Sequence, residues 1–142
     1  MANGRKFSLP SLFGRKAAAT EGERRQIGAS GEDIAAAFLK GIGYVILTRN
    51  YRKRFGEIDI IAEDDTTLVF VEVKTRSTTA FGNPLEAVDG RKQRRMVRAA
   101  LAYLSSQGRH DQPARFDVIA VQLQAQGPPR IEHVRNAFDL TA

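Results

Sequence analysis

Two short segments, GEIDIIA at residues 56–62 and LVFVEVKT at residues 68–75, decide the fold of this chain. The turn-forming run EDDT at residues 63–66 separates them, and both are rich in β-branched residues, so together they predict a β-hairpin. In the second segment both alternating faces begin as apolar. This pattern is typical of a strand that is covered on both sides and is therefore central in its sheet.

Glu72 and Lys74 interrupt this apolar strand on the face that begins with Leu68 and Phe70. A charge at such a position is costly unless a metal ion, an opposite charge or a water-filled cleft receives it. This end of the hairpin is therefore the candidate site.

The register of the hairpin decides whether Asp59 joins this site. Antiparallel partners have a constant sum of residue numbers, and a loop of two or four residues around positions 64–65 makes that sum odd. An odd sum places Asp59 on the face of Glu72 and Lys74, whereas an even sum places it on the opposite face.

Two interpretations of such a face remain open. Paired carboxylates beside an ammonium group suit a hard divalent cation such as Mg²⁺ or Mn²⁺, and the lysine can hold or deprotonate a water molecule. Alternatively, Lys74 forms a structural ion pair with Glu72 or Asp59 at the end of the sheet.

Periodicity and breakers predict the flanking elements. Ser30 and Asp33 resemble a capping box that opens a helix with apolar residues at helical spacing, and Pro84 is typical of a helix start. The chain therefore reads as α/β in the order α-β-β-β-α-β-β. The predicted elements are a helix from Ser30 to Gly41, strands at 44–47, 56–62 and 68–75, a helix from Pro84 to about Ser106, and strands at 116–123 and 130–134.

Length and composition indicate one ordinary globular domain. The chain has 142 residues, of which 42% are hydrophobic and 27% are charged. It has no long apolar stretch and no signal-peptide pattern, so we expect a cytoplasmic protein without a membrane partner. The absence of cysteine excludes thiolate sites and disulfides, and two histidines make a poor basis for a histidine-built site.

Positive charge is concentrated in three segments. The net charge is +6, and residues 1–25 hold six basic and two acidic residues. Residues 1–27 lack a sustained apolar face and are predicted to form a mobile basic arm before a single domain at 28–142. Two further clusters contain no acidic residue and favour a phosphate-bearing partner. They comprise Arg49, Arg52, Lys53 and Arg54, and Arg91, Lys92, Arg94, Arg95 and Arg98.

The clusters have alternative interpretations. Residues 49–54 are predicted to lie in the loop that enters the hairpin and Arg76 follows it, so they either track a nucleic-acid backbone or are simply solvated. Lys92 shares the helix stripe that should face the sheet, so its stem covers the core or its ammonium reaches a scissile phosphate. Phe55 and Phe81 either stack on unpaired bases or, as we favour, fill local apolar gaps.

An ordered run of motifs from about Gly28 to Phe138 resembles the bacterial YraN-like family. That resemblance implies a restriction-endonuclease-like core, with a mixed sheet flanked by helices, a PD-(D/E)xK signature and relatives among the Holliday-junction resolvases. The motifs are GE at 31–32, GY at 43–44, RNYR at 49–52, GEID at 56–59, FVEVKTR at 70–76, FG at 81–82, Lys92, RFDV at 115–118 and NAF at 136–138.

The resemblance also assigns roles to the hairpin residues. By position, Asp59 matches the signature aspartate, and Glu72, Val73 and Lys74 match its (D/E)xK. It implies that Asp59, Glu72 and the carbonyl of Val73 bind one divalent ion. Lys74 would position the attacking water and stabilise the developing charge on the phosphate.

Glu32 matches the helix glutamate of resolvase-type members, so the resemblance implies that it contributes to the metal site directly or through water. Without the resemblance, Glu32 is a first-turn acid that interacts favourably with the helix dipole. Ile58 stands where the signature has proline. This departure changes little because proline supplies no ligand.

Residues and resemblance together predict a metal-dependent endonuclease that hydrolyses phosphodiester bonds in DNA, with branched or otherwise structured DNA as candidate substrate and Mg²⁺ or Mn²⁺ as cofactor. We expect Arg49, Arg52, Lys53, Arg54, Arg76, Lys92 and Arg95 to contact the nucleic acid. One alternative is a binding module that grips nucleic acid or protein without cleaving it. Another is an accessory subunit that is active only with a partner. A homodimer is expected by analogy with resolvases.

Overall fold

The computed structural model describes residues 21–76 and 88–139. Within this part of the chain the elements follow the order α-β-β-β-α-β-β, as the sequence predicts. They are α2 (Glu21–Gly41), β1 (Val45–Lys53), β2 (Gly56–Asp64), β3 (Thr67–Arg76), α3 (Gly90–Gln107), β4 (Ala114–Gln122) and β5 (Arg130–Phe138). No helix among the described residues is long and apolar enough to cross a membrane.

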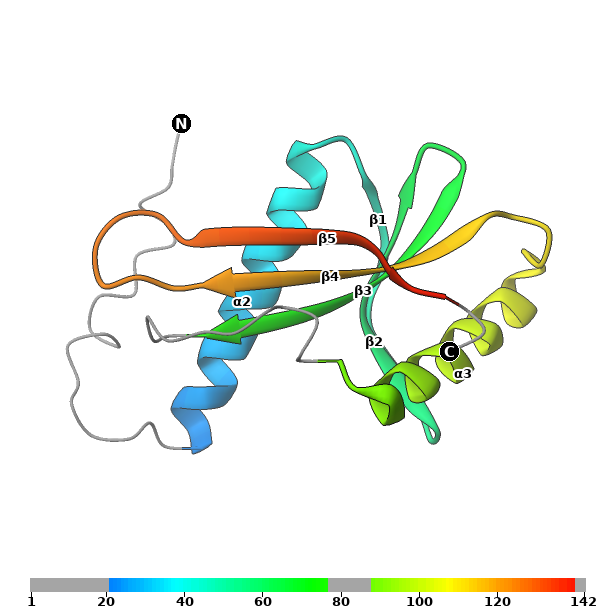
Figure 1. Cartoon of the computed structure of the whole chain (residues 1–142), viewed down its shortest axis with the longest axis horizontal. Helices are drawn as coiled ribbons and strands as arrows, with labels where there is room; N and C mark the ends of the chain where they lie inside the picture. The colour runs from blue at the N-terminus through cyan, green and yellow to red at the C-terminus, as the bar shows by residue number, and fades with distance from the viewer. Residues whose placement is uncertain (1–20, 77–87, 140–142) are drawn as a thin grey trace.

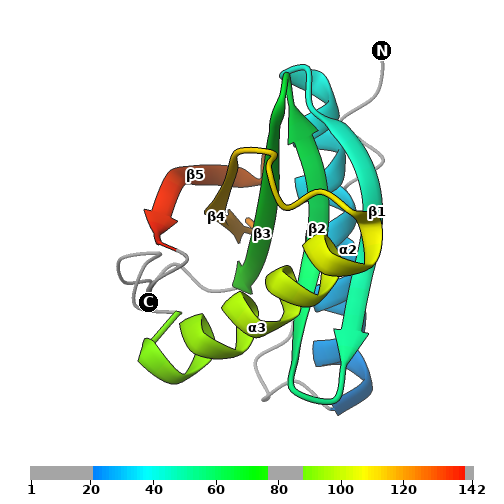
Figure 2. The same cartoon turned by 90° about the vertical axis from the view of Figure 1, so that its right-hand side faces the viewer.

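The five strands form one mixed sheet in the order β1-β2-β3-β4-β5. β3 and β4 are parallel, and the other neighbouring strands are antiparallel. The segment between β3 and β4 contains α3, because a parallel pair needs a crossover connection. α2 covers one face of the sheet and α3 the other, so the fold has three layers (Figures 1 and 2).

The two faces of the sheet carry separate apolar cores. Val69 and Val71 of β3 pack in the core on the α2 side. Leu68 and Phe70 pack on the α3 side, and all four side chains have no exposed surface. β3 is therefore the central, doubly covered strand that the sequence predicts.

The hairpin has the odd register. Ile60 pairs with Val71 and Asp64 pairs with Thr67, so the connecting turn has two residues. Asp65 in that turn adopts a left-handed conformation with φ of 58°, which aspartate tolerates better than most residues. This register brings the end of β2 that carries Asp59 to the end of β3 that carries Glu72.

The start of α2 differs from the sequence prediction. The helix begins at Glu21, so a capping box at Ser30 is wrong, and residues 21–27 of the predicted arm are helical. Ser30 therefore lies inside the helix and does not cap it, and beside it Gly31 lets the helix backbone approach β3 closely, since a Cβ atom there would lie 1.8 Å from Oγ1 of Thr75. Residues 1–20 lie outside the described part.

Two further boundaries are corrected. β1 extends through Lys53, so Arg49, Arg52 and Lys53 lie on an edge strand rather than in a loop. α3 begins at Gly90 instead of Pro84, because the side chain of Asp89 accepts the N–H of Lys92 at 2.9 Å and caps the helix there. Residues 77–87, which include Phe81, lie outside the described residues.

Candidate functional site

The backbone pairing of β2 with β3 ends at Asp59. Ladder pairs run from Asp64 and Thr67 to Ile60 and Val71. Beyond them a side chain continues the connection, because Oδ2 of Asp59 accepts the backbone N–H of Val73 at 2.8 Å. The carboxylate of Asp59 is thereby fixed at the fork between the two strands.

Glu72 lies beside Asp59 and is almost completely buried, with 5% of its surface exposed. The two carboxyl groups are close enough for each to shift the pKa of the other. Burial and the neighbouring charge of Asp59 raise the pKa of Glu72 to about 7, and burial also raises the pKa of Asp59. The two groups therefore compete for negative charge and share a proton when no cation is present.

Lys92 of α3 supplies a counter-charge to this pair. Its Nζ lies 2.5 Å from Oε2 of Glu72, and its side chain remains 43% exposed. Burial alone would lower the pKa of Lys92, but the hydrogen bond and charge of Glu72 outweigh burial and raise it. Lys92 is therefore a charged member of the site and not only a core-covering stem.

Glu32 approaches the site from α2 on the other side of the sheet fork. Burial, followed by the charge of Asp59, raises the pKa of Glu32, while Arg49 and Arg52 act in the opposite direction. Among the described residues no three histidine or acidic side chains form a group that could hold a metal ion. Glu32 thus lies within electrostatic range of Asp59 without completing a three-carboxylate cage.

Lys74 is exposed near the end of β3, two residues beyond Glu72. Within the described residues it forms no ion pair with Asp59 or Glu72, so the structural ion pair considered from the sequence does not form. Lys92 takes that role instead. The ammonium of Lys74 is therefore not engaged by these two carboxylates.

The basic residues of β1 are partly neutralised by nearby acids. Arg49 bonds Asp33 at 2.8 Å, and Arg52 lies 3.4 Å from Glu57. Lys53 stands over the ring of Tyr51 at 5.1 Å. In the turn that follows, Arg54 is exposed beside Phe55.

Phe55 does not fill an apolar gap, contrary to the favoured sequence interpretation, because 41% of its surface is exposed. Phe55 belongs to neither of the two apolar cores. Arg76 ends β3, where its carbonyl accepts the N–H of Leu123, and Arg95 lies on α3.

Sequence reasoning missed a second polar cluster, which centres on Asp117 of β4. This carboxylate has no exposed surface, bonds Arg115 at 3.0 Å and His133 at 2.7 Å, and accepts the backbone N–H of Asn136 at 3.0 Å. Arg115 also donates to the hydroxyl of Tyr44 at 2.6 Å. The cluster depends on an irregularity of the β4–β5 register between Phe116 and Val118, which no local pattern reveals.

The donor set at the strand fork suits a divalent cation. Asp59 and Glu72 provide hard oxygen ligands in mutual contact, and their raised pKa values mean that a cation would relieve their repulsion. The backbone of Val73 adjoins both residues, since Val73 follows Glu72 in β3 and its N–H binds Asp59. The residues at this site therefore fit Mg²⁺ or Mn²⁺.

Comparison with known proteins identifies the family. The model of the uncharacterised protein family UPF0102 matches residues 31–121. A UPF0102 protein of Geobacter sulfurreducens is 54% identical over 114 residues, which cover 80% of this chain and 89% of the relative.

Two further relatives are also UPF0102 proteins. A UPF0102 protein of Geotalea daltonii is 52% identical over 118 residues, with 83% of this chain and 93% of the relative covered. One of Rhodococcus jostii is 49% identical over 112 residues, with 79% and 95% covered. The resemblance seen in the motifs is confirmed, and the chain belongs to the UPF0102, or YraN-like, family.

Proposed function

We propose that this protein is a metal-dependent endonuclease that hydrolyses phosphodiester bonds in DNA, with branched or otherwise structured DNA among its substrates. The observation that carries the proposal is the contact between the carboxyl groups of Asp59 and Glu72 at the strand fork. Burying two like charges together costs stability, so a cation site explains this pair better than folding does.

Asp59, Glu72 and the carbonyl of Val73 would hold the ion. When bound, a divalent ion supplies Lewis-acid polarisation of the phosphate and lowers the pKa of a water molecule. The chain's own contribution is to keep Asp59 oriented through the N–H of Val73 and to bury Glu72. Mg²⁺ and Mn²⁺ both suit oxygen ligands of this kind.

Lys74 is the candidate for orienting the attacking water. It follows the ligand strand directly, is exposed, and is not committed to Asp59 or Glu72 within the described residues. A single preorganised cationic donor at a developing charge is typically worth several kcal/mol of transition-state stabilisation, about 3. Glu32 is proposed to act on the site through water, from its place near Asp59.

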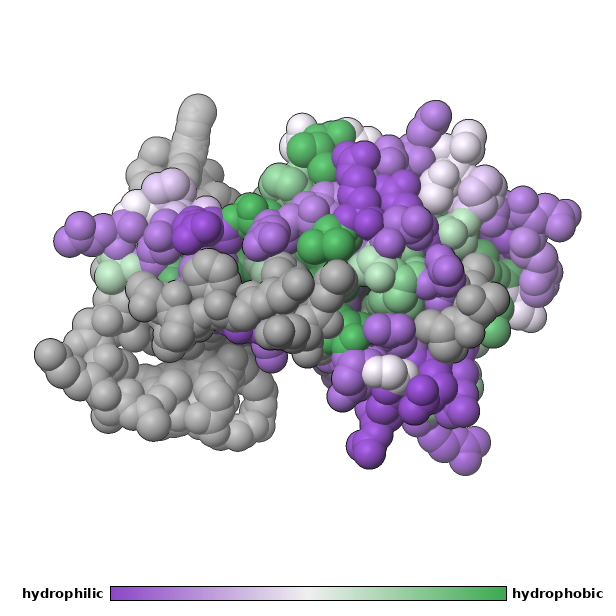
Figure 3. Space-filling model, in the orientation of Figure 1, coloured by the Kyte–Doolittle hydropathy of each residue, from purple (hydrophilic) through white to green (hydrophobic). Residues whose placement is uncertain are grey.

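A hydrophilic surface next to the site supports a DNA partner. Figure 3 shows hydrophilic residues over the start of α3 and the adjoining β1–β2 turn, where two acid-poor segments lie. Exposed cations bind a nucleic-acid backbone largely by releasing its counterions. The proposed contacts are Arg49, Arg52, Lys53, Arg54, Arg76, Lys92 and Arg95.

One observation favours a second candidate, a non-catalytic nucleic-acid-binding module. Lys92 already neutralises Glu72, so the carboxylate pair has a cation within the protein itself. In this case the carboxylates at the strand fork are structural, and only the basic surface binds nucleic acid. An accessory subunit that needs a partner would behave in the same way when tested alone.

Cleavage assays separate these candidates. We predict that the full-length protein cuts at least one of linear, single-stranded, flapped and four-way-junction DNA with Mg²⁺ or Mn²⁺. Glu72→Ala and Lys74→Ala should abolish cutting but not binding, because they remove a metal ligand and a transition-state contact. Glu132→Ala, which removes an exposed carboxylate on β5, is the matched control and should cut normally.

The outcomes are distinct. Cutting that persists in Glu72→Ala contradicts the site assignment. Salt-dependent binding without cutting of any substrate by the wild type supports the binding module or the accessory subunit.

A further inference from the structure

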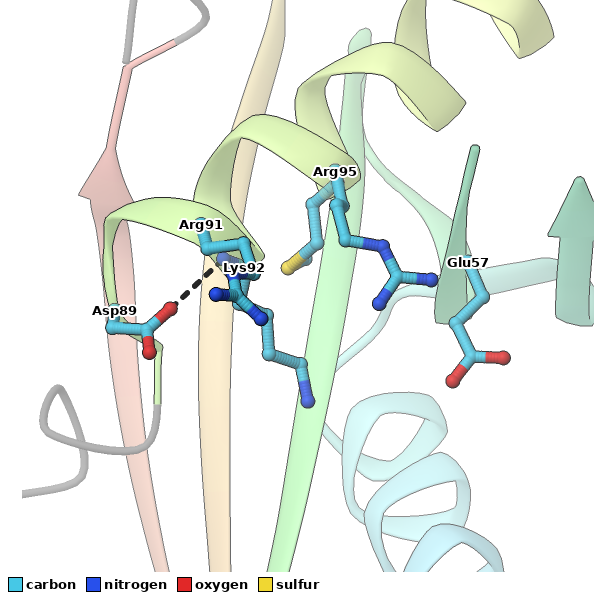
Figure 4. A pocket seen from close by; sticks show the side chains of 6 residues that line it. Glu57, Asp89, Arg91, Lys92 and Arg95 are labelled. Carbon is cyan, nitrogen blue, oxygen red and sulfur yellow. Dashed lines mark hydrogen bonds between the residues drawn. The ribbon is translucent and has the colours of Figure 1, made fainter. Parts of the chain in front are cut away.

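A pocket of about 230 Å³ opens at the start of α3, next to the strand fork. Its lining is mainly charged, and Figure 4 shows the Lys92 amine directed into it and the Arg95 guanidinium directed toward Glu57. The lining residues are Glu57, Asp89, Arg91, Lys92, Arg95 and Met96.

The acidic residues of the pocket are already engaged. Asp89 accepts the backbone N–H of Lys92 at 2.9 Å as the helix cap, and Glu57 lies 3.4 Å from Arg52 of β1. In the part of the chain that the structure describes, Arg91 and Arg95 have no carboxylate within ion-pair distance. The pocket therefore carries an excess of positive charge from its side chains.

Helix stability does not account for Arg91, which lies in the first turn of α3. Basic residues at the positive end of a helix dipole are unfavourable, and the first turn of α3 has no acidic residue. A local feature that opposes stability is expected where function requires it. Here a bound anion would compensate the positive charge at the start of α3.

The pocket and the strand fork are physically continuous. Lys92 lines the pocket and also contacts Glu72. The backbone of α3 is held against β2, since a Cβ atom on Gly56 would lie 2.1 Å from the carbonyl oxygen of Arg95. Arg95 is thus placed beside the fork by a close backbone contact.

We propose that this pocket is a phosphate-binding subsite that holds the nucleic-acid phosphate adjacent to the bond being cleaved, with Arg91 and Arg95 as its dedicated cations and Lys92 shared with Glu72. The subsite depends on the proposed function for the identity of its ligand as nucleic acid. A phosphodiester carries one negative charge and a terminal phosphomonoester up to two, and guanidinium groups bind both through paired hydrogen bonds.

The test uses the full-length protein without metal, in EDTA, so that its result does not depend on cleavage. Amide chemical shifts are followed while inorganic phosphate, thymidine 5′-monophosphate or the dinucleotide TpT is added. The largest saturable shifts should occur at the start of α3 and at Gly56. Tighter binding of the monophosphate assigns the subsite to a terminal phosphate, whereas tighter binding of TpT assigns it to an internal one.

Two variants with the same charge change provide the matched comparison. Arg95 and Arg98 are both exposed on α3, but only Arg95 lines the pocket, so Arg95→Gln tests the pocket and Arg98→Gln is its control. Arg95→Gln should weaken binding of the better nucleotide probe about tenfold, the usual effect of losing one charge-assisted hydrogen bond. Arg98→Gln should change it less than about twofold, because Arg98 does not line the pocket.

Equal weakening by both variants, or shifts spread over every basic segment, would overturn the subsite. Localised phosphate binding in a protein that cuts no DNA would leave the subsite standing and contradict the proposed endonuclease. DNA cleavage without localised phosphate binding would contradict the subsite and leave the proposed endonuclease standing.

Discussion

Two buried carboxyl groups, Glu72 and Asp117, titrate in opposite directions because their neighbours differ. For Glu72, burial and the like charge of Asp59 raise the pKa to about 7. Burial also acts to raise the pKa of Asp117, but hydrogen bonds from His133, Asn136 and Arg115 outweigh it and lower the pKa. The same desolvation is therefore only partly compensated by Lys92 at Glu72, whereas hydrogen bonds outweigh it at Asp117.

Replacing Glu72 by glutamine should stabilise the metal-free protein at pH 8. The folded-state pKa of about 7 exceeds the ordinary value of 4.5. The folded chain therefore holds the extra proton between these values, and its stability falls as the pH rises through them. Glutamine removes the charge but also removes the partner of Lys92, so we expect a net gain of about 1–2 kcal/mol.

Urea unfolding at pH 5, 6.5 and 8 in EDTA measures this effect. The wild type should lose stability across the series, and Glu72→Gln should lose less. The exposed variant Glu132→Gln should follow the wild type. Parallel curves for Glu72→Gln and wild type would contradict the raised pKa.

Two glycines set how closely the helices approach the sheet. Gly31 lets α2 approach Thr75, and Gly56 lets the backbone of α3 approach β2 at Arg95. These contacts bring Glu32 and Lys92 toward the same strand fork from the two helices. The site is therefore a product of helix docking as well as of the hairpin.

Gly56→Ala should destabilise the protein by about 1–3 kcal/mol, the usual cost of forcing an extra methyl group into a packed contact. The new Cβ would meet the carbonyl oxygen of Arg95 at 2.1 Å, and a backbone atom cannot move as a flexible side chain does. Gly41→Ala, where the added Cβ meets nothing within 4 Å, should change stability by less than about 0.5 kcal/mol. Urea unfolding compares the two, and equal effects would show that α3 shifts freely.

Asp117→Asn should loosen the edge strand β5. The carboxylate joins β4 to His133 and to the N–H of Asn136, so its loss should cost about 2–4 kcal/mol. The pKa of Asp117 is lowered from its ordinary value of 3.8. Its contribution is therefore present above pH 3.8 and is lost as the pH falls through the lower folded-state pKa.

Hydrogen exchange and acid titration test this role of Asp117. Amides of β5 should exchange faster in Asp117→Asn, while those of the β2–β3 hairpin stay protected. The stability deficit should shrink below about pH 3.8. Uniform acceleration over the whole sheet would indicate global destabilisation instead.

For the molecule as a whole, local patterns predict the order of elements and narrow the hairpin register to the odd case only if the turn has two or four residues. Alternation in β3 and a two-residue turn were sufficient to bring Asp59 near Glu72. The contact between Lys92 and Glu72 could not be predicted, because it depends on where the crossover places α3. The start of α2 was also mispredicted, because a capping pattern such as that at Ser30 can occur inside a helix, and α2 continues through it from Glu21.

The distribution of charge over the whole chain leads to the last prediction. The net charge is +6, and residues 1–20 carry four basic residues and no acidic one, so removing them leaves +2 while the sequence of α2 remains complete. Each cation that contacts a duplex phosphate contributes about 0.9 to the slope of log K against log salt. Deleting residues 1–20 should therefore lower that slope by at least about 1 and weaken binding to every DNA sequence alike.

A full-length variant with Arg5, Lys6, Arg15 and Lys16 changed to glutamine separates charge from chain length and should reproduce the loss. An unchanged slope in both proteins would assign all phosphate contacts to the remaining residues, including the basic surface at the start of α3.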